Sequence, residues 1–180
     1  MSRVLAVLLV SSAAAAPLAG QATPAAAPAS ASVTAVRSMW EMMTNYVTQS
    51  AEMMAEEKYS YRPTADVRTF GEIIGHVAGA QNMICAVALG ETPPAEDAVE
   101  KSAKTKAALV EALKTSTAYC GKAFSQTDAD SRTPAKLFGR DVTRFHALTL
   151  NAMHNSEHYG NLVTYLRMNG MVPPSSQGGM

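Results

Sequence analysis

Residues 69–90 read TFGEIIGHVAGAQNMICAVALG, and this stretch decides the fold class. Thr69, followed three positions later by Glu72, has the spacing of a capping box, which satisfies free backbone N–H groups at the start of a helix. Apolar residues then recur in the steps of three and four that mark one helix face, at Phe70, Ile73, Val77, Ala80, Ile84 and Val87. Gly90 ends the pattern, because glycine is the residue most often found just past a helix C-terminus. The stretch therefore predicts a helix that ends at about Leu89.

Three more segments show the apolar period of a helix face, and they span residues 33–57, 97–124 and 141–168. Residues 125–139 are turn-rich, and no segment alternates convincingly between apolar and polar residues as a half-buried strand does. Four helices without a sheet predict an all-α fold of the helical-bundle type.

The chain has 180 residues, which suits one domain with a core of its own. Its 15 basic and 15 acidic residues cancel, and neither sign gathers into a block. Proteins that bind nucleic acid carry a basic patch or stripe. We therefore expect no nucleic-acid partner.

The N-terminal residues have the composition of a secretory signal peptide. Arg3 precedes the apolar run Val4 to Val10 and the small residues from Ser11 to Ala16. The apolar run is far shorter than the ~20 residues that a membrane-spanning helix needs, so we expect a cleaved signal and no stable membrane span. The protein should then be periplasmic or secreted.

Composition also sets the expected domain limits. We assign residues 1–22 to the signal peptide, with cleavage between Ala16 and Ala22 left open. Residues 23–32 are mostly Ala, Pro, Ser and Thr, which cannot form a core, and are expected to be a disordered tether. The bundle should span residues 33–174, and residues 175–180 should form a loose tail.

Two of the four histidines, His154 and His158, form the spacing H-x-x-x-H in the last helical segment. Four residues advance a helix by about 400°, so both imidazoles lie on one side, one turn apart, and can share a metal ion. Asn155 stands where the glutamate of the H-E-x-x-H protease motif would be, which disfavours a metalloprotease. The spacing alone is also compatible with two solvated histidines.

Helical-wheel positions indicate the surroundings of each histidine. His154 and His158 fall on a mostly polar face of their helix, which either meets solvent or lines a cleft. His76 lies on the flank of its helix's apolar stripe, where it can point into a groove between helices. His146 lies about 80° around the helix from His154 and is expected to be a surface or rim residue.

The segments FGEIIGHVA (residues 70–78) and HNSEHYGNLVTYLRMNGMVPPSS (residues 154–176), with YSYRPT (residues 59–64), resemble the DinB family of the DinB/YfiT-like superfamily. The resemblance covers nearly the whole chain after the tether. It implies a four-helix bundle with a crossover between helices two and three, and a homodimer. The first helix, rich in Met and with Trp40, can provide the dimer surface, and Trp40 itself is expected to be a core or interface anchor. The resemblance also implies one divalent metal ion bound by three ligands, which carry over as His76, His154 and His158.

The two cysteines, Cys85 and Cys120, leave two alternatives open. Export would place them in an oxidising compartment, which favours a disulfide, whereas buried free thiols are common core residues. The crossover that the resemblance implies would make the two helices parallel and bring both cysteines to similar heights.

The first functional hypothesis is a metal-dependent hydrolase or transferase that acts on an unknown small molecule. Three histidines and water suit zinc, nickel and iron, and zinc or nickel is the expected cofactor. Glu72, Glu157 and Tyr159 lie near the ligands and are candidates to orient or assist. The alternative is a non-catalytic protein in which the ion staples two helices, and a third hypothesis is a helical scaffold whose histidines bind nothing.

Overall fold

The structure is a computed structural model that describes residues 30–178. The predicted signal peptide and most of the predicted tether lie outside this range, and the first helix begins at Ala31. The elements, in chain order, are α1 (Ala31–Met53), η1 (Glu56–Lys58), α2 (Phe70–Leu89), α3 (Ala98–Ser102), α4 (Lys106–Ala123), α5 (Asp128–Ser131), β1 (Pro134–Leu137), β2 (Arg140–Thr143), α6 (Arg144–Met168) and η2 (Pro174–Ser176).

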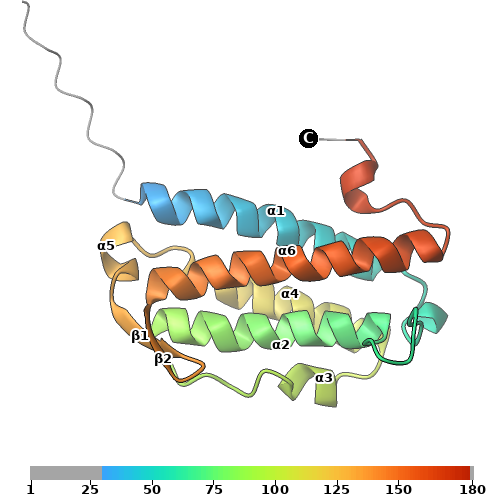
Figure 1. Cartoon of the computed structure of the whole chain (residues 1–180), viewed down its shortest axis with the longest axis horizontal. Helices are drawn as coiled ribbons and strands as arrows, with labels where there is room; N and C mark the ends of the chain where they lie inside the picture. The colour runs from blue at the N-terminus through green and yellow to red at the C-terminus, as the bar shows by residue number, and fades with distance from the viewer. Residues whose placement is uncertain (1–29, 179–180) are drawn as a thin grey trace, which may run out of the picture.

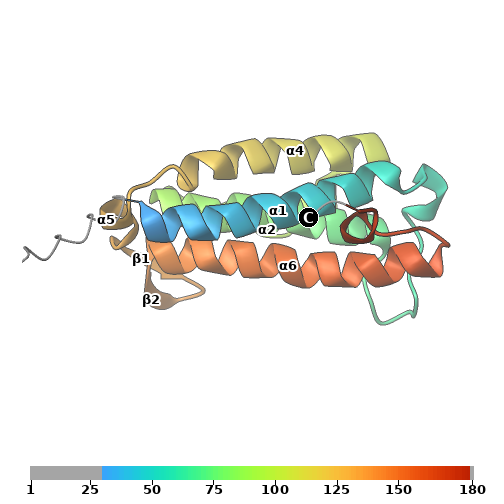
Figure 2. The same ribbon diagram turned by 90° about the horizontal axis from the view of Figure 1, so that it is seen from above.

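The four long helices α1, α2, α4 and α6 form a bundle, as the sequence predicted (Figure 1). Helices α1 and α6 run in one direction, and α2 and α4 run side by side in the other (Figure 2). The connection between α2 and α4 must therefore return along the length of α2, and it carries the short helix α3 against α2. This crossover is the connection that the family resemblance implied.

The helix predicted over residues 97–124 is divided into α3 and α4. The break lies at Thr105, whose side chain accepts a hydrogen bond from Ala108 N and so starts a new helix. The division has a topological cause, because α3 belongs to the crossover while α4 belongs to the bundle. The apolar period alone does not distinguish one bent path from one long helix.

A small antiparallel hairpin, β1–β2, occupies part of the segment predicted to contain only turns. Phe138 and Gly139 join the strands with φ of 50° and 75°, and positive φ at both central residues is the geometry of the tightest hairpins. Strands of four residues are too short to show a clear alternation, so the sequence did not predict them. The hairpin also moves the start of α6 from Asp141 to Arg144, after the cap Thr143.

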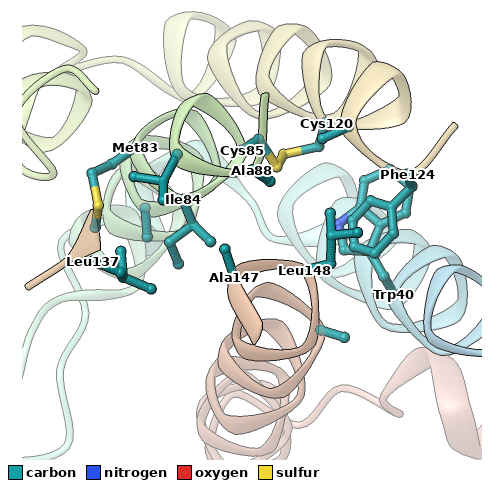
Figure 3. Close-up of a cluster of buried hydrophobic side chains, with 14 of the residues drawn as sticks. Trp40, Met83, Ile84, Cys85, Ala88, Cys120, Phe124, Leu137, Ala147 and Leu148 are labelled. Carbon is teal, nitrogen blue, oxygen red and sulfur yellow. A yellow bond between two sulfur atoms is a disulfide. The ribbon is translucent and has the colours of Figure 1, made fainter. Parts of the chain in front are cut away.

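One apolar cluster fills the end of the bundle next to the hairpin (Figure 3). Trp40 of α1 stacks on Phe124 at 4.4 Å between ring centroids, which confirms Trp40 as a core anchor. Leu137 of β1 is buried in the same cluster, so the hairpin covers this end of the core.

Cys85 and Cys120 form a disulfide that ties α2 to α4, with their Cα atoms 5.3 Å apart. The parallel course of the two helices brings both cysteines to the same height. Asn151 of α6 is buried beside the bridge, with Nδ2 2.8 Å from Cys85 Sγ and 3.2 Å from Cys120 Sγ. The structure therefore favours the disulfide over two buried thiols.

A buried polar layer separates this cluster from a second apolar cluster at the other end of the bundle. Each long helix contributes one fully or almost fully buried residue to the layer, namely Thr44, Gln81, Ser116 and Asn155. Gln81 accepts a hydrogen bond from Trp40 Nε1 and donates to Ser116, and Asn155 donates to Thr44. The layer therefore connects all four helices through side-chain hydrogen bonds.

Helix α2 is long and apolar enough to cross a membrane by length and composition, but 83% of its apolar window is buried inside the bundle, as in a core helix.

The segment predicted as a loose tail is attached to α6 where it begins. Ser175 and the Tyr159 hydroxyl are hydrogen-bonded to each other, and Arg167 donates a hydrogen bond to Ser176.

We expect the disulfide to contribute to stability mainly by restricting the unfolded chain. It joins residues 35 positions apart, and closing a loop of that size corresponds to roughly 3–4 kcal/mol. The double variant Cys85→Ala with Cys120→Ala should therefore unfold at lower urea concentration, and a reductant should change the wild type but not the variant. Equal midpoints for wild type and variant would contradict a stabilising bridge.

We also expect Gln81→Ala to lower the free energy of unfolding by about 2–4 kcal/mol, because Trp40 Nε1 and Ser116 would lose a buried partner. Gln49→Ala is the matched control, since Gln49 is exposed on α1 and its loss should change stability by less than about 0.5 kcal/mol. Urea denaturation measures both, and similar losses in the two variants would show that the polar layer has no special role.

Candidate metal centre

His76 of α2 meets His154 and His158 of α6 between the two helices. Nε2 of His154 lies 3.1 Å from Nε2 of His76 and 3.1 Å from Nε2 of His158. The three ring centroids are 4.4 to 4.9 Å apart. The structure thus brings together the three histidines that sequence analysis selected, and together they could hold a metal ion.

The positions of the three rings follow from the helix faces that carry them. His154 and His158 lie one turn apart on α6, and the face that carries them packs against α2. His76 is 8% exposed and His158 is 8% exposed, so the cluster lies at the edge of the core. His146, the fourth histidine, is exposed and takes no part in the cluster, as predicted.

Burial keeps the three imidazoles neutral. It lowers the pKa of His76 to about 4 and that of His154 to about 3. Burial also lowers the pKa of His158, and the positive charge of Arg68 acts in the same direction on each of the three. Neutral imidazole is the form that binds metal, so all three rings are ready to act as ligands at neutral pH.

The nitrogen positions fit a divalent ion. A neutral imidazole has one N–H, so the single hydrogen on each ring cannot satisfy the close Nε2 contacts and also leave every Nδ1 protonated. If each Nδ1 carries the hydrogen, the Nε2 lone pairs face one another, and a cation between them removes their repulsion. An ion about 2.0–2.1 Å from each nitrogen in tetrahedral geometry separates the nitrogens by about 3.3 Å, close to the 3.1 Å observed for the two pairs that include His154.

Two carboxylates approach the other nitrogen of His76. Glu96 Oε1 lies 3.8 Å and Glu100 Oε2 lies 4.0 Å from His76 Nδ1. Carboxylates beside the free nitrogen of a metal-binding histidine fix the tautomer and the ring orientation. Glu100 Oε2 is buried and, among the described residues, has no hydrogen-bond partner, so its negative charge favours a proton on the nearby His76 Nδ1.

Glu96 and Glu100 were not predicted from the sequence, because neither belongs to the helix that carries His76. Two glycines of α2 let the crossover come this close. A Cβ at Gly79 would lie 1.9 Å from Glu96 O, and one at Gly75 would lie 2.9 Å from Glu100 Cα. The spacing of these glycines, four residues apart on one face of α2, is the signal in the sequence that points to a closely packed neighbour.

A cleft of about 580 Å³ opens beside the histidines. Its lining includes His158, Arg68 and Glu157. Of the three residues predicted to orient or assist, Glu157 is therefore the one that lines this cleft. Glu72 instead completes the capping box of α2 with Thr69, and the Tyr159 hydroxyl bonds Ser175, so both have structural partners.

Comparisons with known proteins place this geometry in a family. The chain superposes on a DinB-like protein, YjoA, from Bacillus subtilis, with a TM-score of 0.65, 24% identity and coverage of 81% of this chain and 99% of that one. For YfiT from Bacillus subtilis, described as a probable metal-dependent hydrolase with an unusual four-helix bundle topology, the TM-score is 0.61, the identity 16% and the coverage 84% and 95%.

A mycothiol-dependent maleylpyruvate isomerase also shares the fold, with a TM-score of 0.60, 17% identity and coverage of 72% of this chain. The chain spans 60% of the length of that isomerase. No curated protein matches the chain. The family profile described as the DinB superfamily matches residues 39–162, which contain all three histidines of the cluster. The chain therefore belongs to the DinB superfamily.

Proposed function

We propose that this protein is an exported metal-dependent enzyme, a hydrolase or transferase, which binds one divalent ion through His76, His154 and His158. The observation that carries the proposal is the convergence of three neutral imidazole nitrogens beside a cleft of about 580 Å³. Three nitrogen ligands leave a tetrahedral ion with one open position, and open positions distinguish catalytic from structural sites. Zinc or nickel fits this donor set, and so does iron.

A bound ion would supply Lewis-acid chemistry and a lowered pKa for a coordinated water or substrate group. The residues of the chain have separate tasks around it. Glu96 and Glu100 place negative charge near Nδ1 of His76, and burial favours the unprotonated form of the three imidazoles. Glu157, in the lining of the cleft, is the carboxylate in position to take up or release a proton beside His158.

The alternative is a non-catalytic ion that staples α2 to α6. One observation favours it, because the three ligands come from two different helices and an ion would cross-link them. The cleft beside His158 favours the enzyme, since a purely structural ion has no need of an open approach. Binding of azide to the ion separates the two functions, because only an ion with an exchangeable position takes up the anion.

Export is proposed on two grounds. The N-terminal residues have the pattern of a signal peptide, and the Cys85–Cys120 disulfide is typical of proteins in an oxidising compartment. The periplasm or the exterior of the cell satisfies both. We further propose a homodimer that uses α1, where Met39 and Met42 are exposed.

The metal proposal predicts that untagged protein, recovered from its native compartment, contains one divalent ion per chain. His154→Ala should lose most of the metal, because His154 Nε2 is the atom in contact with both other ligands. His146→Ala is the matched control, since His146 lies on the same helix but is exposed, and it should keep its metal. Elemental analysis measures all three proteins. Equal metal content in the wild type and His154→Ala would end the metal proposal.

We also predict that metal affinity is nearly independent of pH between about 5.5 and 8. Three histidines with the ordinary pKa of about 6.5 would lose affinity by about a thousandfold over this interval, because protons compete for each ring. The lowered pKa values of about 4 for His76 and about 3 for His154 remove that competition until the solution is more acidic. Calorimetric titration should therefore show a change of less than about tenfold, and a loss near a thousandfold would contradict the buried, neutral site.

A further inference from the structure

One cation of the cleft, Arg68, is not used by the metal site itself. Arg68 lines the cleft together with His158, and its side chain is 45% exposed. It immediately precedes Thr69, the N-cap of α2, and α2 is the helix that carries His76. Its guanidinium is therefore available to contact a ligand in the cleft beside His158.

Two hydrogen bonds position Arg68, one to its backbone and one from its side chain. The Tyr165 hydroxyl donates a hydrogen bond of 2.5 Å to the Arg68 carbonyl oxygen, which holds the backbone. Arg68 Nε donates to Glu100 Oε1 at 3.2 Å. The other oxygen of the same Glu100 lies 4.0 Å from His76 Nδ1, so one carboxylate contacts the guanidinium and lies near a ligand ring.

These contacts leave the two terminal NH₂ groups of Arg68 for another partner. No hydrogen bond from either group is found among residues 30–178. A planar guanidinium with its outer edge free is suited to bind a carboxylate in a paired, two-point contact. Because Arg68 lines the cleft, the carboxylate can belong to a small molecule bound there.

Charge points to the same class of ligand. Three neutral imidazoles cancel none of the positive charge of a divalent ion, and Arg68 adds to it. The lining also contains two exposed carboxylates, Asp66 and Glu157, which repel a molecule with negative charge along its whole length. The site therefore favours a ligand with one acidic group at one end.

We propose that the cleft binds a small substrate through a carboxylate held by Arg68, while a second donor atom of the same molecule reaches the ion at the three histidines. The proposal rests on the proposed metal site and names its substrate class. The cleft volume of about 580 Å³ is in the range of small-molecule sites. Ile73 and Tyr165 in the lining provide an apolar wall for the remainder of the substrate.

The test uses the full mature protein loaded with Co²⁺, whose visible spectrum changes when a ligand binds the ion. Mercaptoacetate and mercaptoethanol are the probes, because both offer a sulfur to the ion but only mercaptoacetate carries a carboxylate. Wild type should bind mercaptoacetate at least about tenfold more tightly, as expected for a charge-assisted pair. Arg68→Gln should lose most of this preference, because it removes the positive charge that binds the carboxylate. Glutamine is chosen because its amide can still donate to Glu100.

Two further variants serve as controls. Arg62→Gln removes a cation of the same loop that instead bonds Ala65 O, and it should keep the preference. Arg68→Lys should restore part of it, because charge remains but the paired geometry is lost. Co²⁺ stoichiometry and melting temperature, measured on each variant, should match those of the wild type, which shows that the fold and the histidine cluster are intact.

The outcomes separate the two proposals. If both thiols change the cobalt spectrum and Arg68→Gln keeps the full preference, chelation by the ion explains it and the role of Arg68 is overturned, while the metal site stands. Equal affinity of the wild type for the two thiols would have the same meaning. If wild type binds no Co²⁺, the proposed function fails first, and the substrate class fails with it.

Discussion

The buried polar layer of the bundle is the constraint on which the rest of the structure depends. Gln81 bonds residues of α1 and α4, and Asn155 of α6 completes the layer through Thr44. A buried amide that loses its partners costs several times the net gain of a satisfied one, so no helix can slide by a turn without a large penalty. His154 directly precedes Asn155, and His76 lies less than two turns before Gln81. The register in which Gln81 and Asn155 form these hydrogen bonds is therefore the register that brings the histidines together.

The crossover connection performs a second task that its topology makes possible. An ordinary antiparallel hairpin between α2 and the next helix would leave the outer side of His76 to solvent. The crossover instead passes over α2, where Gly75 and Gly79 have no side chain to prevent close contact. Glu96 and Glu100 reach His76 from that side. The same topology makes α2 and α4 parallel, which is why the disulfide can form between residues in the last third of each helix.

The features that the sequence predicts well are those carried by one helix at a time. The capping box and apolar stripe of α2 set its bounds, and the spacing of His154 and His158 places both rings on one face. The features that it misses depend on contacts between distant segments. The hairpin consists of four-residue strands, α3 leaves the helical path to cross α2, and Glu100 meets His76 only because of that path. His76 itself needed the family resemblance, since an isolated histidine on a helix flank has many uses.

The disulfide also bears on the chemistry of the cluster. Both cysteines of the chain are bonded to each other, so neither can serve as a thiolate ligand, and the cluster offers imidazole nitrogens alone. Glu96 and Glu100 lie near Nδ1 of His76 and not at the convergent Nε2 atoms, so they are not direct ligands of an ion held there. A cation held by three neutral nitrogens keeps its full charge. Such a site polarises whatever occupies its open position more strongly than one with anionic ligands, and it attracts anions, which is the physical link between the three histidines and Arg68 in the neighbouring cleft.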